Sequence, residues 1–87
     1  MTERLFDENA YLTEFSANVI DSKPENDGSF LILLDKTAFF PEGGGQFPDL
    51  GTLNSAPVTD VQEDKDGNIW HKCEKHFPAE LYRDCRI

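Results

Sequence analysis

The residues best suited to chemistry lie in one glycine-rich stretch, residues 37–49. Its three consecutive glycines, residues 43–45, can adopt positive φ and let a ligand or a neighbouring segment come close to backbone amide groups. The run is neither a phosphate-binding loop nor a dinucleotide fingerprint, because no Lys-Ser/Thr pair follows it and its glycines have no gaps between them. Alone, it is typical of a plain turn between strands, so its neighbours decide the interpretation.

A second set of reactive residues stands near the end of the chain. All four are competent zinc ligands: His71, Cys73, His76 and Cys85. On a strand, His71 and Cys73 would share a face. Their spacing nevertheless matches no common zinc pattern, and such residues in a strand more often pack in a core. We therefore predict no metal site in this chain.

The length and composition indicate one small, acidic globular domain. Eighty-seven residues supply one hydrophobic core, so we predict a single domain over residues 1–87. Aromatic residues make up 11% of the chain, enough to build that core without a metal or a disulfide bond. The formal net charge is −9, and nucleic-acid affinity depends on Lys and Arg. We expect weak or no nucleic-acid binding by the domain alone, with the acidic residues forming a solvated surface.

The sequence shows no targeting segment. No signal-peptide pattern follows Met1, and the longest apolar run, residues 30–34, is far shorter than the roughly 20 residues of a membrane helix. We therefore expect no membrane association and a cytoplasmic location, with Cys73 and Cys85 as free thiols.

Short strand patterns alternate with turn signals along the chain, and no stretch has the 3.6-residue apolar period of a helix. The strand-like runs are residues 15–20, 29–34, 50–53, 57–62 and 69–73, with one more strand starting after residue 76. Asp27-Gly28 is a hairpin signal, and it predicts that the first two runs pair antiparallel. The pattern indicates an all-β fold, a small antiparallel barrel or sandwich. Because the chain ends at Ile87 inside a hydrophobic pattern, we expect a cut domain with an open edge there.

The flanks of the glycines carry a specific resemblance. The stretch reads TAFFPEGGGQ over residues 37–46 and continues with Asp49, Gly51 and Leu53. It resembles the glycine-rich motif of the alanyl-tRNA synthetase editing region and of the freestanding AlaX-type editing proteins. The resemblance covers essentially the whole chain, because residues 33–35 precede the motif, and residues 58–61 and 67–71 follow it, in family order. The opening residues 2–15 resemble the start of freestanding members, which favours that type.

The resemblance implies a barrel of the translation-protein β-barrel type, packed against a C-terminal editing domain. That editing domain would hydrolyse the ester of Ser or Gly wrongly attached to alanine tRNA, using zinc held by a His-x-x-x-His pair and a Cys-x-x-x-His pair. Neither pair occurs in these 87 residues. We therefore expect an accessory domain that is not catalytic by itself, with the zinc in the editing domain that is absent from this chain.

Two alternatives remain open from the sequence. The chain could be a fragment of a full alanyl-tRNA synthetase, whose parent protein would use ATP to aminoacylate tRNA. It could also be a non-catalytic module that contacts a protein through its acidic surface. Which misacylated tRNA is edited does not follow from these residues.

The resemblance also implies that the loop faces the active site of the editing domain, beside the 3′ end of alanine tRNA. No catalytic residue is predicted in the chain. The residues predicted to face the substrate site are Thr37, Phe39, Phe40, Glu42, Gly43, Gly44, Gly45, Gln46 and Asp49.

These side chains each have a functional and a structural interpretation. Gln46 could hydrogen-bond the tRNA end or the aminoacyl group, or it could tie the loop to its own backbone. Phe39 and Phe40 could stack on the terminal adenosine, although anchoring of the loop is the more common use. Thr37 could position a substrate hydroxyl or pack at a strand end. The carboxylates of residues 42 and 49 could act as an acid/base pair, but turn capping by the second is favoured.

Overall fold

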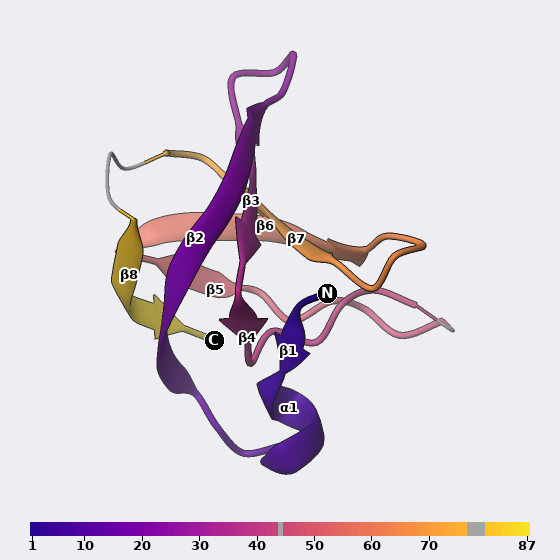
Figure 1. Cartoon of the computed structure of the whole chain (residues 1–87). Coiled ribbons are helices and arrows are strands. Elements are labelled where there is room, and N and C mark those ends of the chain that lie inside the picture. The colour runs from indigo at the N-terminus through magenta and orange to yellow at the C-terminus, as the bar shows by residue number, and fades with distance from the viewer. Residues whose placement is uncertain (44, 77–79) are drawn as a thin grey trace.

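The computed structural model describes residues 1–43, 45–76 and 80–87 of the chain. β-Strands dominate these residues, and one short helix lies near the N-terminus (Figure 1). In chain order the elements are β1 (Glu3–Arg4), α1 (Leu5–Glu8), β2 (Glu14–Pro24), β3 (Phe30–Leu34), β4 (Lys36–Thr37), β5 (Gly51–Leu53), β6 (Ala56–Glu63), β7 (Ile69–Cys73) and β8 (Leu81–Arg86). The predicted all-β fold is confirmed.

Six strands form a closed barrel in the order β2-β3-β7-β6-β5-β8. Every neighbouring pair is antiparallel, as predicted for a small antiparallel barrel. The last strand, β8, pairs with β2 on one side and with β5 on the other. The expected open edge at the end of the chain is therefore wrong, because closure of the barrel pairs β8 on both sides.

The hairpins follow the predicted turn chemistry. Gly28 and Gly67 have φ of +88° and +82°, a conformation that glycine adopts without steric cost. Asn54 and Ser55 also have positive φ, which is typical of the two-residue turn that joins β5 to β6 here. The predicted antiparallel pairing of β2 with β3 is confirmed. However, β2 continues to Pro24 rather than ending near residue 20, because residues 22–24 still pair with β3 and only the residues after them turn.

The core lies inside the barrel and receives side chains from all six strands. Its buried members are Ala17, Ile32, Leu34, Phe39, Leu53, Ala56, Val58, Val61, Ile69, Cys73, Tyr82 and Cys85. Val58 and Val61 both face inward although they are three residues apart. A register shift between Val58 and Asp60 explains this, because a bulge moves the in/out alternation by one residue.

The N-terminal segment, for which the sequence predicts no element, covers part of the barrel beside β4. β1 pairs parallel with β4, and both lie at the same side of the molecule as α1 (Figure 1). Thr2 is buried, and its hydroxyl oxygen accepts a hydrogen bond from the backbone N–H of Ile69 at 2.9 Å. Phe6 of α1 packs on Phe40 with 4.9 Å between ring centroids. The start of the chain is therefore fastened to β7 and to the first part of the glycine-rich loop.

Candidate functional site

The glycine-rich loop, residues 38–50, joins β4 to β5, and its two ends are clasped together. The backbone N–H of Phe40 donates to Oδ2 of Asp49 at 3.0 Å. In return, the backbone N–H of Asp49 donates to the carbonyl oxygen of Phe40 at 2.9 Å. Because these two bonds close the loop across nine residues, the ends of the loop have a defined position.

The middle of the loop pairs with the edge of β6. The backbone N–H of Glu42 donates to the carbonyl oxygen of Val61 at 2.9 Å, and the Gln62 side-chain amide donates to the Glu42 carboxylate at 2.5 Å. The Gln62 amide also donates to Asp60, so it lies between two carboxylates. This arrangement fixes the first half of the loop against the barrel.

The turn of the loop is made by glycine and carries exposed side chains. The backbones of Gly43 and Gln46 exchange hydrogen bonds at 2.9 and 3.3 Å. Gly45 has φ of +83°, which a residue with a Cβ rarely adopts. Beyond this turn Phe47 is 87% exposed and Leu50 is 53% exposed. Gly44, also predicted to face the substrate site, lies outside the described residues.

A cavity of about 410 Å³ lies beside the loop. Its lining joins the loop to both ends of the described chain: Phe6, Asp7, Ala10, Leu12, Thr13, Ala38, Phe40, Gln46, Asp49 and Ile87. Its wall combines aromatic and aliphatic side chains with four polar ones, namely Asp7, Thr13, Gln46 and Asp49. A hollow that combines apolar side chains with a few polar groups is a usual form of a site that binds a ligand or receives another chain segment.

The predicted site residues divide into two groups. Phe40, Gln46 and Asp49 line the cavity, and Glu42 and Gly43 are exposed nearby. Thr37 and Phe39, in contrast, have no exposed surface, and the Phe39 ring packs edge-on against Phe15 and His71 in the core. A stacking role for Phe39 or a direct substrate contact by Thr37 would require these side chains to leave the core.

The proposed acid/base pair is not brought together by any bond. The Glu42 carboxylate accepts from Gln62, whereas the Asp49 carboxylate accepts from the backbone of Phe40. Each carboxylate therefore has its own structural partner. For Asp49 this partner is the one that a loop-capping role requires.

The four candidate zinc ligands do not gather. Within residues 1–43, 45–76 and 80–87, no three His, Cys, Asp or Glu side chains are placed to hold a metal ion together. Both ring nitrogens of His71 already have protein partners, and Cys73 and Cys85 are free and buried. Burial raises the pKa of both thiols, that of Cys85 to about 12, which disfavours the thiolate that binds metals. The residues present do not fit a zinc ion.

A second hollow, of about 360 Å³, lies by the β2–β3 turn. Two of its charged groups form an ion pair: the Lys72 ammonium is 3.0 Å from the Asp27 carboxylate, which also accepts from the Ser29 hydroxyl at 2.6 Å. The bonds from Ser29, together with Lys72, hold the pKa of Asp27 well below its usual range. This hollow contains no residue of the glycine-rich loop, so we place the candidate site at the other cavity.

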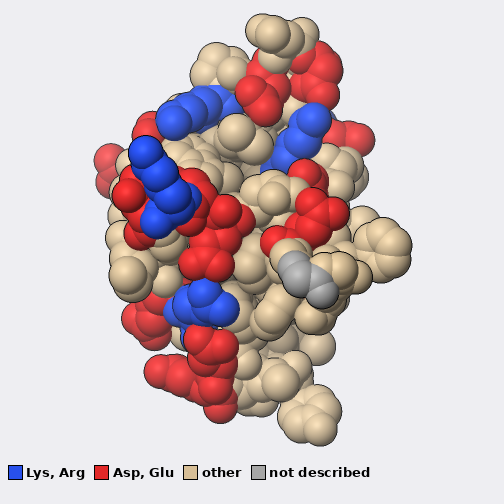
Figure 2. All heavy atoms as spheres, turned by 90° about the vertical axis from the view of Figure 1, so that its right-hand side faces the viewer, with Lys and Arg blue, Asp and Glu red and all other residues tan. Residues whose placement is uncertain are grey.

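The surface is acidic without a basic patch on the face that Figure 2 shows. Acidic side chains cover much of that face, and Lys and Arg are scattered among them. Such a surface offers no continuous track for phosphates. Within the part of the chain that the structure describes, no helix combines the length and the apolar character needed to cross a membrane.

Comparison with known proteins identifies the family of this chain. No protein-family model matches the chain. It is 45% identical over 71 residues to the alanyl-tRNA editing protein AlaX-M of Pyrococcus horikoshii, covering 82% of the chain and 31% of that protein. It is 38% identical over 85 residues to AlaX-L of the same organism, covering 92% of the chain and 21% of that protein. The chain is a domain of the alanyl-tRNA editing family.

The same domain occurs in a larger class of protein. The alanine–tRNA ligase of Halobacterium salinarum is 43% identical over 79 residues, which is 82% of the chain and 8% of the ligase. The chain thus spans less than a third of the length of each of these relatives. Its resemblance to the editing family, first seen in the glycine-rich motif, is confirmed.

One glycine of the family motif has a role in the barrel rather than in the loop. A Cβ at Gly51 would lie 1.9 Å from the carbonyl oxygen of Arg86 and 2.7 Å from Cα of Ile87. Both are backbone atoms of the segment that closes the barrel, and they cannot move aside as a flexible side chain could. Glycine at this position of the editing-family domain therefore permits the close approach of β5 to β8.

Sequence reasoning missed the cavity residues that come from the chain ends. Phe6, Ala10 and Leu12 lie before the first barrel strand, and Ile87 follows the last one. The N-terminal sequence has scattered apolar residues but no periodicity that would indicate a wall of a site. The signal present in the sequence was the apolar type of Phe6, Ala10 and Leu12 themselves.

Proposed function

We propose that this chain is the accessory glycine-rich barrel domain of an alanyl-tRNA editing protein that hydrolyses Ser or Gly misattached to alanine tRNA. The observation that carries the proposal is the cavity beside the loop, where Phe40, Gln46 and Asp49 of the family motif meet apolar residues from both chain ends. Sequence similarity to AlaX-M and AlaX-L supports the same function.

In this proposal the cavity side of the domain faces the editing domain of the full-length protein, and the loop shapes the pocket that receives the tRNA 3′ end. The exposed Gln46 amide supplies donors and an acceptor for a polar substrate group. Apolar residues around it exclude water from the ester. Basic regions elsewhere in the full-length protein hold the tRNA, because this domain has a net charge of −9.

Hydrolysis itself is assigned to the rest of the protein. The residues described here hold no group of metal ligands, so a zinc ion that acts on the ester would bind in the editing domain. We expect the isolated chain, purified without a tag, to retain no stoichiometric zinc. We also expect it to hydrolyse Ser-charged alanine tRNA no faster than the uncatalysed rate. Retained zinc or turnover by the chain alone would place the active site in this domain instead.

The test is deacylation of Ser-charged alanine tRNA by the full-length protein and its Gln46→Ala variant. We expect kcat/KM to fall roughly tenfold, since one hydrogen bond to a buried polar group is lost. Asn26→Ala is the matched control, because Asn26 is an exposed amide of the β2–β3 turn that does not line the cavity, and it should leave kcat/KM within about twofold. Wild-type deacylation by Gln46→Ala would show that the loop only connects two strands.

The similarity to alanine–tRNA ligases favours a second candidate for the full-length protein. In that case the same domain would belong to a ligase that also uses ATP to aminoacylate tRNA. The complete reading frame distinguishes the two, because only a ligase would carry an aminoacylation region. A cytoplasmic location is part of either proposal.

A further inference from the structure

A buried hydroxyl and a buried imidazole connect the barrel wall to the loop. Thr37 ends β4 and His71 lies in the middle of β7, and neither has exposed surface. Oγ1 of Thr37 is 2.8 Å from Nε2 of His71, and Nδ1 of His71 is 3.0 Å from the carbonyl oxygen of Ile32. A carbonyl oxygen only accepts, so Nδ1 carries a proton. Because burial lowers the pKa of His71 to about 4, the ring is neutral at pH 7 and Nε2 carries the lone pair. The hydroxyl of Thr37 must therefore donate to Nε2.

The same hydroxyl oxygen accepts a hydrogen bond from the loop. The backbone N–H of Phe39 donates to Oγ1 of Thr37 at 3.0 Å. The result is one directed series of bonds, from the Phe39 amide through Thr37 and His71 to Ile32 in β3. Every member of the series is buried, and every polar atom in it has a partner.

This series fixes the point at which the loop leaves the barrel. The Phe39 ring lies 5.3 Å from the His71 ring, edge-on, so a hydrogen bond and an aromatic contact hold the same residue. The next residue, Phe40, carries the two backbone bonds to Asp49 and lines the cavity. A shift of Phe39 would therefore move Phe40 and Asp49, which are walls of the site.

We propose that Thr37 and His71 are positioning residues, which hold the glycine-rich loop in the arrangement that the cavity requires without touching the substrate themselves. This inference rests on the proposed function for its catalytic consequence, but the positioning can be measured in the isolated chain. Thr37 and Phe39 thus differ from the predicted site residues that line the cavity, because they act on the site from inside the core.

The first test uses Thr37→Val, which keeps the shape of the side chain and removes the hydroxyl, and Thr37→Ser, which restores it. Amide hydrogen exchange of the isolated chain is followed by NMR. With Thr37→Val we expect exchange of the Phe39 and Phe40 amides to rise roughly tenfold or more, because a buried bond is lost locally. Thr37→Ser should return the rates to within about threefold of wild type.

Thr59→Val is the matched control, because Thr59 is an exposed threonine of β6 and its hydroxyl makes only a 3.5 Å contact to a backbone carbonyl. It should leave exchange of the Phe39 amide unchanged. Equal exchange at Phe39 in wild type and Thr37→Val, or a global rise across all strands in place of a local one, would overturn the positioning role.

A measurement on the unmodified chain covers the case in which Thr37→Val does not fold. The ¹⁵N spectrum of the His71 ring at neutral pH should show a protonated Nδ1 and an unprotonated Nε2. The opposite tautomer would break the series of bonds and overturn the inference. In the full-length protein, kcat for deacylation should fall roughly tenfold in Thr37→Val and recover in Thr37→Ser. A full-length wild type without deacylase activity would refute the proposed function while the exchange and ring measurements still decide the positioning.

Discussion

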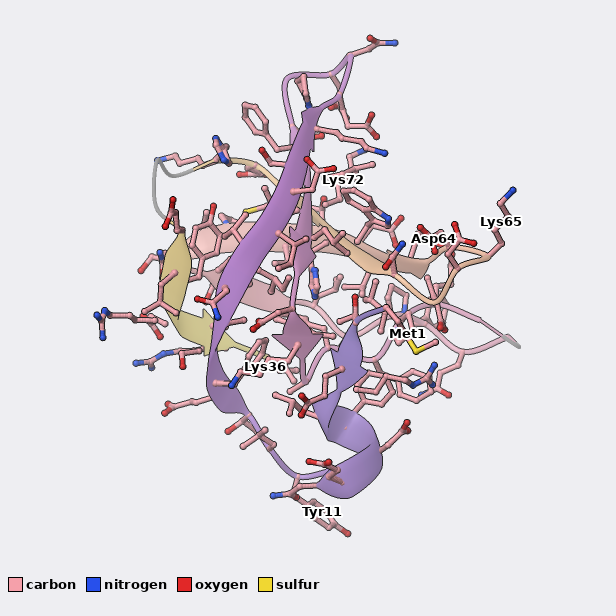
Figure 3. All side chains as sticks on the ribbon, in the orientation of Figure 1. Met1, Tyr11, Lys36, Asp64, Lys65 and Lys72 are labelled. Atoms are coloured by element: carbon pink, nitrogen blue, oxygen red, sulfur yellow. The ribbon has the colours of Figure 1, made fainter. Side chains whose placement is uncertain are left out.

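Two connections of the barrel contain a glycine at nearly the same φ, yet they use their polar groups in opposite ways. In the turn between β6 and β7, residues 64–68, the polar groups are paired within the domain. The Asp64 carboxylate accepts from the backbone N–H groups of Asp66 and Asn68 and from the indole N–H of Trp70, and the Gly67 carbonyl oxygen accepts from the backbone N–H of Thr2. These bonds, that of Trp70 first, lower the pKa of Asp64 to about 2. Figure 3 shows Asp64 at the base of this turn and Lys65 pointing away into solvent.

The glycine-rich loop instead has hydrogen bonds at its base and in its first half, and it exposes the side chains of residues 46 and 47. Its base is tied to Asp49 and, through Thr37, to the core, whereas Phe47 near the tip is 87% exposed. A turn whose polar groups are already paired with one another, with Trp70 and with Thr2 has little to offer a partner. A long connection with a fixed base and an open tip can present side chains at a defined position, which is what binding sites on loops require.

The largest expected effect is on stability, and it tests whether the barrel that carries both connections needs the close approach of β5 to β8. Gly51→Ala should lower the free energy of unfolding by about 3 kcal/mol or more, because its Cβ would overlap backbone atoms of the closing segment. Gly43→Ala is the control: its Cβ would meet nothing within 4 Å, and we expect a change within about 0.5 kcal/mol. Urea unfolding followed by far-UV circular dichroism measures both. Similar stability of the two variants would show that the β5–β8 seam can separate without loss.

The second effect distinguishes the two connections by pH. Burial lowers the pKa of His71 from 6.5 to about 4, so between these values the unfolded chain binds a proton that the folded chain does not. The stability contributed by the unprotonated ring is complete above pH 6.5 and is lost as the pH falls towards 4, by about 3 kcal/mol. The stability contributed by the ionised Asp64 carboxylate is lost in a lower pH range. Its pKa is depressed from 3.8, so this stability begins to be lost only as the pH falls to about that value.

Unfolding measured between pH 7.5 and 4.5 should therefore show a slope in wild type that His71→Asn removes. His76→Asn is the control, because it removes the other, exposed imidazole of the chain. An identical slope in wild type and His71→Asn would mean that the ring is protonated in the folded state and cannot accept from Thr37.

The third effect compares the two glycines directly. Gly45→Ala and Gly67→Ala should each lower stability by about 1 kcal/mol, because both positions have positive φ. Only Gly45→Ala should also lower deacylation by the full-length protein, since residue 67 lies in the turn between β6 and β7 and does not line the cavity. A matching loss of activity in both variants would remove the functional difference between the two connections.

The sequence predicts the barrel well because its signals are local. Asp27-Gly28 and Asp66-Gly67 set hairpins, and short apolar runs set the strands between them. The closure by β8 could not be predicted, because the approach of Gly51 to Arg86 joins residues that are distant in sequence. The same holds for the candidate site: its local features could be predicted, and its long-range contacts could not. Its glycine turn was recognisable, but the burial of Thr37 against His71 depends on strands that only the fold brings together.

The smallest expected effect on stability comes from the exposed tip of the loop. Phe47→Ser in the isolated chain should change the free energy of unfolding by no more than about 0.5 kcal/mol, because the ring buries little surface in this domain. In the full-length protein the same change should lower deacylation roughly tenfold if the editing domain covers the ring, since burial of a Phe contributes about 1.5–3 kcal/mol. Ile20→Thr is the control: it removes an exposed apolar side chain from β2, away from the loop, and should leave deacylation unchanged. Loss of stability in the isolated Phe47→Ser domain would mean that the tip is part of the fold, and unchanged deacylation would mean that the tip has no partner. Only unchanged stability of the isolated domain, together with reduced deacylation by the full-length protein, supports a tip that binds another surface.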